Sequence, residues 1–157
     1  MAETWLRRPE RARLALEESI ELNPSLCQAY MQLGSALYLG GDPEAAIPAM
    51  RTALRLAPHH TQLFCVLAEL GMAHLMLSEY REAVKYSDLA LIRKPAYWYA
   101  HVIKINALIR LGEADLARVA HAELRLAQPG FTLEHVGWLP FAARKWIRFL
   151  QEGLERT

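Results

Sequence analysis

The feature that most constrains the fold of this chain is a segment of about 34 residues that recurs three times and ends each time on a proline. Pro95 and Pro129 are 34 residues apart (129 − 95 = 34), whereas Pro58 precedes Pro95 by 37 (95 − 58 = 37). The longer interval is the same period with three residues inserted around positions 59–63. Such a period indicates stacked helical hairpins, because each repeat buries its apolar face only against its neighbours.

Small side chains recur at matching positions of the repeats. Counting back 24, 12 and 5 residues from each closing proline gives Gly34, Gly71 and Ile105, then Ala46, Ala83 and Ala117, then Ala53, Ala90 and Leu124. Small residues suit the first two positions because the two helices of a hairpin cross closely there, at a distance set by the side chains between them. Ile105 departs from the pattern, so we expect the third hairpin to cross differently or more loosely.

The turn inside each repeat is marked as well. Seventeen residues before the closing prolines lie Gly41, Ser78 and Gly112. In the first repeat Asp42 is predicted to cap the second helix, with Pro43 at its first position. In the second repeat Ser78 is predicted to cap the helix of Tyr80–Leu91.

These signals organise residues 1–157 as a single all-α domain. We place full repeats at 27–60, 64–97 and 98–129, a partial repeat at 10–24 and a C-terminal cap at 131–155. The partial repeat supplies only a second helix. It is either a native cap or the start of a piece cut from a longer protein, and we favour the piece.

The C-terminal cap is expected to cover the apolar face at the end of the stack. Phe131, Leu133 and Val136 begin a short helix, residues 138–140 turn the chain, and Lys145–Leu154 form an amphipathic helix. The apolar side of that helix carries Trp146, Phe149 and Leu150, and the polar side carries Arg144, Arg148 and Glu152. We interpret it as a capping helix; the alternative is a docking helix for a second protomer.

Composition and charge exclude several classes of protein. Hydrophobic residues make up 53% of the chain, and the net charge of +1 provides no strong field, so we expect neither nucleic acid nor membrane as a partner. No apolar run approaches the roughly 20 residues of a membrane span, and acidic residues interrupt the N-terminus where a secretion signal would need an apolar core, which favours the cytoplasm. The arginines near the start, interrupted by Glu10, are predicted to lie on a solvated helix face; they are Arg7, Arg8, Arg11 and Arg13.

No pattern points to catalysis, a cofactor or a metal. Cys27 and Cys65 lie in different helical segments without CxxC spacing, so we expect reduced thiols. The histidines are scattered; they are His59, His60, His74, His101, His121 and His135. The chain contains no GxSxG, P-loop, GxGxxG or HExxH motif, so we expect no enzymatic activity.

The period and the three-fold register resemble the tetratricopeptide (TPR) family over about residues 10–129, which implies a right-handed α-solenoid of about three helix pairs. Repeat 2 and the tail also resemble a bacterial subgroup in which such repeats follow a class III nucleotide cyclase or a winged-helix regulator. In the tail the matching residues are Leu139, Pro140, Phe141, Leu150, Gly153 and Leu154. Ala142 and Ala143 replace the acidic-proline pair of that subgroup, and neither activity is carried over to this chain.

In this family the first helices of successive pairs line a concave groove. The inward positions predicted from the register are Gln28, Met31, Ser35, Tyr38 and Leu39, then Cys65, Ala68, Met72, Leu75 and Met76, then Tyr99, Val102, Asn106, Ile109 and Arg110. Met31, Ala68 and Val102 stand where one subclass carries basic residues that grip a C-terminal carboxylate, so that clamp is not expected here.

The apolar, methionine-rich groove predicts a protein-interaction module that binds a helix or peptide, because thioether side chains adapt to varied apolar partners. The competing interpretation is that Met72, Leu75 and Met76 are simply core. The alternative functions are a homodimerisation domain of a larger regulator and, with less support, an enzyme built on a repeat frame.

Overall fold

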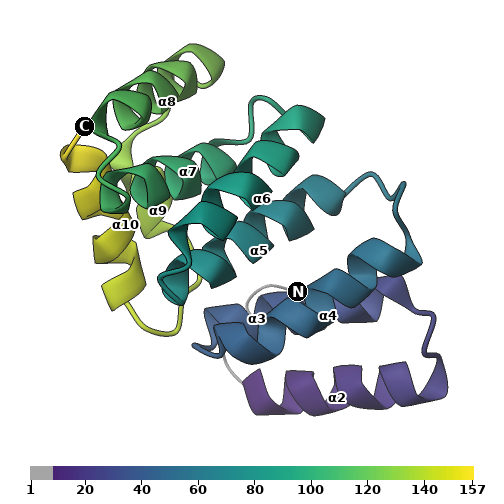
Figure 1. Ribbon diagram of the computed structural model, residues 1–157. Coiled ribbons are helices and arrows are strands. Elements are labelled where there is room, and N and C mark those ends of the chain that lie inside the picture. Colours follow the sequence, from purple (N-terminus) through teal and green to yellow (C-terminus); the bar gives the residue numbers. More distant parts are fainter. Residues whose placement is uncertain (1–8) are drawn as a thin grey trace.

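The computed structural model describes residues 9–157, and this part of the chain is helical without a strand. Its helices are α2 (Pro9–Leu22), α3 (Cys27–Leu39), α4 (Pro43–Leu56), α5 (Leu63–Met76), α6 (Tyr80–Arg93), α7 (Trp98–Arg110), α8 (Ala114–Ala127), α9 (Leu133–Gly137) and α10 (Lys145–Glu155). Figure 1 shows them following one another along a curved row, with the short α9 and the last helix α10 turned back beside α7. The predicted all-α solenoid is confirmed.

The three full repeats correspond to the hairpins α3–α4, α5–α6 and α7–α8, and α2 is the helix of the partial repeat. Each hairpin packs on the next through its second helix, as α6 does on α7, and the first helices α3, α5 and α7 also contact one another in sequence. The core is therefore continuous from one end of the row to the other, as nearest-neighbour stacking requires.

The small residues lie where the hairpin helices cross. A Cβ added to Gly34 would lie 2.5 Å from Met50 Cγ, and one added to Gly71 would lie 3.2 Å from the Ala83 carbonyl oxygen. α7, which carries Ile105 at the equivalent position, packs less extensively on α8 than α3 does on α4 or α5 on α6. The looser third hairpin agrees with the expectation from the sequence.

The predicted cap of α4 is confirmed and that of α6 is wrong. Asp42 Oδ1 accepts a hydrogen bond from the Ala45 amide at 3.1 Å, with Pro43 in the first turn. Ser78 instead adopts φ 61°, and Glu79 precedes α6 without a side-chain cap. Ser78 thus shares the left-handed conformation of Gly41 (φ 99°) and Gly112 (φ 78°). The period located the turn correctly, but the turn needs a positive φ at this residue and leaves no capping role for a hydroxyl.

Replacing Ser78 with glycine should therefore stabilise the fold. A left-handed residue with a Cβ costs roughly 1–2 kcal/mol, and the greater freedom of glycine in the unfolded chain offsets part of this gain. We expect Ser78→Gly to raise the unfolding free energy in urea by up to about 1 kcal/mol. The reciprocal control, Gly112→Ser, should lower the unfolding free energy by a similar amount. If both substitutions changed the unfolding free energy in the same direction, that result would contradict the argument.

Candidate functional site

The predicted groove residues fall into two groups. Most are buried: Met31, Tyr38, Ala68, Met72, Leu75, Tyr99, Val102 and Asn106. Gln28 is exposed, and the others are half-buried: Ser35, Leu39, Cys65, Met76, Ile109 and Arg110. The core interpretation therefore holds for Met72 and Leu75, which are 0% and 1% exposed, and these two side chains do not form an accessible binding surface.

The chain's own last helix covers the α7 part of the concave face. The buried side-chain amide of Asn106 donates from Nδ2 to the carbonyls of Val102 (3.0 Å) and Leu150 (3.1 Å). The Arg110 guanidinium lies 3.4 Å from the centre of the Phe149 ring. A side chain on Gly153 would overlap Asn106, so glycine is what allows α10 to approach this closely.

The segment before α10 covers the middle of the face. Phe141 is buried and packs edge-on against Tyr38, with ring centres 5.9 Å apart. The Ala142 amide donates to the Leu39 carbonyl at 2.9 Å. α10 buries Ile147, Leu150 and Leu154 within its own chain, so the structure supports a capping helix. Of the predicted apolar side, Leu150 is buried, whereas Trp146 and Phe149 are only half-buried.

The tail leaves a pocket of about 530 Å³ at the other half of the concave face, between α2, α3 and α5. Its walls combine apolar side chains with amides and charged groups. They include Met31, Leu39, Val66, Gln28, Gln32, Ser35 and Glu69, and the tail contributes Pro140 and Ala142. Predicted groove residues thus line the pocket on the α3 side, whereas those of α7 do not reach it.

Glu69 is the polar centre of this pocket, and the sequence reasoning missed it. Its half-buried carboxylate accepts a hydrogen bond from Ser35 Oγ at 2.7 Å. Burial raises the pKa of Glu69 to about 7, and the Ser35 hydrogen bond opposes this shift. The available signal was composition, because Glu69 is the single Asp, Glu, Lys or Arg in the otherwise apolar sequence of α5.

A cluster of phenols lies beside Glu69. The Tyr38 and Tyr99 hydroxyl oxygens are 3.3 Å apart in the buried region between α3 and α7. Burial is the main cause that raises the pKa of both phenols, and the negative charge of Glu69 adds to it. These hydroxyls therefore stay protonated near neutral pH and keep the floor of the concave face uncharged.

Arg13 closes the pocket on the α2 side. Its guanidinium lies 3.2 Å from Glu10 and 3.8 Å from Glu17, which are on the same helix. Arg11 is exposed, as predicted for a solvated helix face, whereas Arg7 and Arg8 lie outside the described residues.

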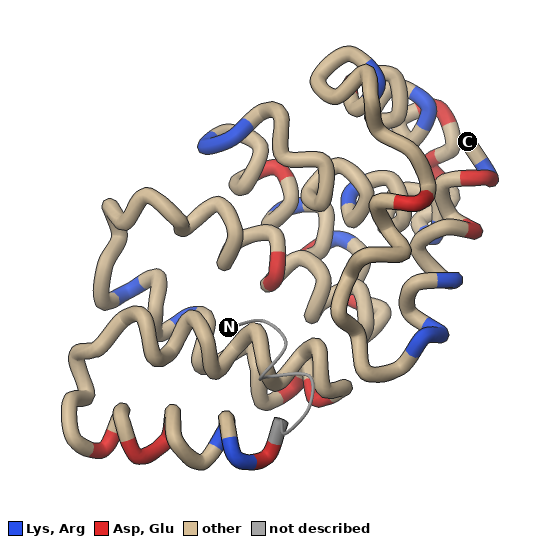
Figure 2. Tube along the Cα trace, turned by 180° about the vertical axis from the view of Figure 1, so that it is seen from behind, with Lys and Arg blue, Asp and Glu red and all other residues tan. Residues whose placement is uncertain are grey.

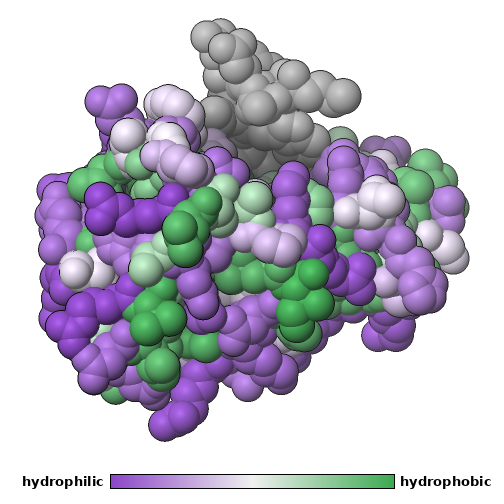
Figure 3. Space-filling model, turned by 90° about the horizontal axis from the view of Figure 1, so that it is seen from above, coloured by the Kyte–Doolittle hydropathy of each residue, from purple (hydrophilic) through white to green (hydrophobic). Residues whose placement is uncertain are grey.

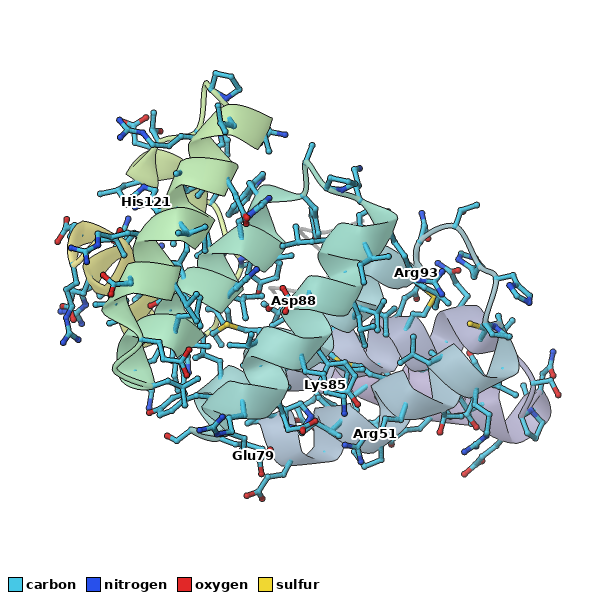
Figure 4. The ribbon with its side chains drawn as sticks, turned by 45° about the horizontal axis from the view of Figure 1, so that its top comes forward. Arg51, Glu79, Lys85, Asp88, Arg93 and His121 are labelled. Atoms are coloured by element: carbon cyan, nitrogen blue, oxygen red, sulfur yellow. The ribbon has the colours of Figure 1, made fainter. Side chains whose placement is uncertain are left out.

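A second pocket, of about 440 Å³, lies on the outer side between α6, α7 and α8. Three of its charged groups pair with one another, because Lys104 Nζ is 2.9 Å from Asp88 and 4.0 Å from Glu123, and Arg81 and Glu113 also line it. Figure 4 shows Asp88 on α6 pointing toward α7, while the other labelled basic residues, Arg51 on α4, Lys85 and Arg93 on α6 and His121 on α8, lie apart from one another. The lysine of this pocket is therefore already paired with carboxylates of the chain itself.

The rest of the surface is mixed in character. Acidic and basic positions are interspersed over the helices in Figure 2. Seen from above, hydrophobic residues form small patches divided by hydrophilic ones (Figure 3). Within residues 9–157, no group of three or more His, Cys, Asp or Glu side chains is arranged to hold a metal ion.

The histidines have structural partners where they are buried. His74 contacts the Glu79 carboxylate and stacks on Tyr86, and His101 Nε2 lies 2.8 Å from the Pro95 carbonyl oxygen.

Among the described helices, none combines the length and the apolar character that crossing a bilayer requires.

Comparisons with known proteins support the repeat interpretation. Residues 6–61 match the family described as Tetratricopeptide repeat. No curated protein sequence matches the chain.

Solved structures of MamA have a similar fold. One crystal structure of MamA aligns over 92% of this chain and 87% of its own, with 21% identity and a TM-score of 0.71. A second crystal structure of MamA aligns over 81% of this chain and 69% of its own, with 22% identity and a TM-score of 0.72. The structure of the MamA RS-1 ArsTM double mutant aligns over 98% of this chain and 88% of its own, with 21% identity and a TM-score of 0.73. At this identity the likeness establishes the fold, which is that of a TPR solenoid.

The contact between Gly153 and Asn106 generates a stability prediction. In Gly153→Ala the new methyl group displaces the Asn106 side chain from its two buried hydrogen bonds. The lost packing and hydrogen bonds outweigh the roughly 1 kcal/mol that alanine gains over glycine within a helix. We expect a net loss of about 2 kcal/mol in urea unfolding, with faster amide exchange in α10.

Gly137→Ala is the matched control for this prediction. Nothing lies within 4 Å of a Cβ at Gly137, so its stability should stay within about 0.5 kcal/mol of wild type. A Gly153→Ala protein as stable as the control would show that α10 does not depend on this close approach.

Glu69 predicts a pH dependence of stability. Its folded-state pKa of about 7 lies above the ordinary value of 4.5. Between these values the folded chain holds a proton that the unfolded chain has released, so the contribution is complete below pH 4.5 and is lost as pH rises through about 7. We expect Glu69→Gln to remove this loss and to be more stable than wild type at pH 8, as measured by urea unfolding from pH 4.5 to 8.

The exposed Glu18 provides the control for this pH series. Glu18→Gln should retain the wild-type decrease in stability. An identical slope in Glu69→Gln would contradict the assignment of the decrease to Glu69.

Proposed function

We propose that this chain is a protein-interaction module that binds a peptide segment of a partner protein in the pocket between α2, α3 and α5. The observation that carries the proposal is the division of the concave face, whose α7 half is filled by α10 while its α3 half retains a pocket of about 530 Å³. This volume lies within the range of about 300–1,000 Å³ that is usual for ligand sites.

The chemistry of the walls favours a peptide. Met31, Leu39 and Val66 provide apolar surface, while Gln28 and Gln32 carry amides that both donate and accept hydrogen bonds. A peptide presents alternating apolar side chains and backbone polar groups, so it complements both kinds of wall. Stacked helix pairs typically use their concave surface in this way.

We further propose that the module is an adaptor or the regulatory part of a bacterial signalling protein located in the cytoplasm. The support is the resemblance of repeat 2 and of the tail residues Leu139, Pro140 and Phe141 to that subgroup. Homodimerisation has less support, since α10 packs Ile147, Leu150 and Leu154 within its own chain.

A peptide-display selection with the full chain tests the proposal. Peptides enriched on the wild type should lose at least about tenfold in affinity on Gln32→Trp, because the indole fills the pocket, and this loss corresponds to about 1.4 kcal/mol of binding free energy. Gln32 is exposed, so the substitution should leave the unfolding temperature unchanged.

The matched control is Gln62→Trp, which places the same side chain at an exposed position outside the pocket. It should bind the selected peptides as the wild type does, in fluorescence anisotropy titrations. If no peptide is enriched, or if Gln32→Trp and Gln62→Trp bind equally well, the pocket is not the binding site.

A further inference from the structure

The pocket carries an unbalanced negative charge. Its charged lining residues are Glu10, Arg13, Asp42 and Glu69. Arg13 is paired with acids of its own helix, and Asp42 accepts the hydrogen bond that caps α4. Among residues 9–157, no Lys, Arg or His lies within ion-pair distance of Glu69. A cationic ligand would complement this charge.

The geometry of Glu69 indicates the kind of cation. Ser35 already donates to Oε2, while Oε1 accepts no hydrogen bond from a described residue. A guanidinium binds best to a carboxylate that offers both oxygens to its planar fork, whereas an ammonium is a compact point charge that needs only one. A carboxylate with one oxygen already hydrogen-bonded suits an ammonium, which needs only the other oxygen.

The walls also suit the long apolar stem of such a side chain. Met31, Leu39 and Val66 line the same pocket as Glu69. A lysine side chain packs its methylene groups along apolar surface and places only its charged end against a polar group. The Ser35 hydroxyl, which already donates to Glu69, retains lone pairs that can accept a second ammonium hydrogen.

We propose that the pocket takes a lysine side chain of the partner peptide, with its ammonium on Glu69 and its stem against Met31 and Leu39. This inference rests on the proposed function and adds the chemistry that the site recognises. Glu69 stands on the inner face of the solenoid, near the positions where basic residues would grip a carboxylate in the clamp subclass. The charge preference of the groove is thus reversed, from an acidic to a basic ligand.

The titratable groups around Glu69 do not change charge in the pH range where Glu69 does. From α3 it faces Tyr38, from the α7 side Tyr99 and Tyr97, and within α5 Cys65, and burial raises the pKa of each of these groups. From α2 the pocket receives the paired Glu10 and Arg13. The lysine itself has an ordinary pKa near 10.4. Between pH 5.5 and 8, Glu69 is therefore the group of this cluster whose charge changes, and the ion pair should strengthen as pH rises through about 7.

The test uses acetylated and amidated synthetic versions of the peptides that the display selection enriches. In each peptide the lysines are replaced one at a time by norleucine, which keeps the stem and removes the charge, or by arginine. At pH 8 we expect one norleucine replacement to weaken binding to the wild type by about tenfold or more. The same replacement should have little effect on binding to Glu69→Gln, or on binding to the wild type at pH 5.5.

Glu10→Gln is the matched control within the pocket. It removes a lining carboxylate that is already paired with Arg13, so it should keep the wild-type sensitivity to norleucine. If Glu10→Gln lost its sensitivity to norleucine as fully as Glu69→Gln, the effect would come from the general negative charge of the pocket. That result would overturn a direct contact between the lysine and Glu69.

The remaining outcomes separate this inference from the proposed function. Selected peptides could lose binding to Gln32→Trp and yet bind the wild type equally well when every lysine is replaced by norleucine, or more tightly when a lysine is replaced by arginine. Either result would overturn the lysine assignment but would leave the proposed peptide binding intact. Binding that depends on a free N-terminal amine would also overturn it. If no peptide depends on the pocket at all, the proposed function fails first.

Discussion

The hydrogen bond from the Asn106 side chain to the Leu150 carbonyl is the contact on which the concave face depends. It joins the first helix of the last repeat to a tail helix 44 residues further along the chain, in a region sealed from water. A buried amide that lost this acceptor would remain unsatisfied, at a cost of about 1–3 kcal/mol. The lack of a side chain at Gly153 brings α10 within reach of Asn106, so one amide and one glycine together fix where the tail lies.

The position of the tail in turn decides which part of the concave face remains accessible to a ligand. With α10 on α7 and Phe141 against Tyr38, the residues that would form a continuous groove become core, and accessible surface is left mainly along α3 and the first half of α5. The charged groups that remain there are mostly acidic. The net charge of +1 conceals this local imbalance because it sums groups that never face the same pocket.

Local signals in the sequence predicted the fold well. The spacing of the prolines, the glycines at 34 and 71, and the Asp42 cap each report a short-range requirement of a helical hairpin, and the structure confirms them. Ser78 shows the limit of such signals, since the same residue type can cap a helix or occupy a left-handed turn, and only the backbone conformation distinguishes the two. The site was less predictable: where the tail docks and how strongly Glu69 is desolvated both depend on contacts between residues far apart in the sequence.

The tail and the pocket are also physically connected. Leu39 lines the pocket with its side chain and holds the tail through its carbonyl, which accepts the Ala142 amide, while Pro140 and Ala142 form part of the pocket wall. The placement of the segment that leads into α10 therefore also shapes the pocket. The C-terminal segment is in this sense both the cap of the solenoid and a part of the wall of its pocket.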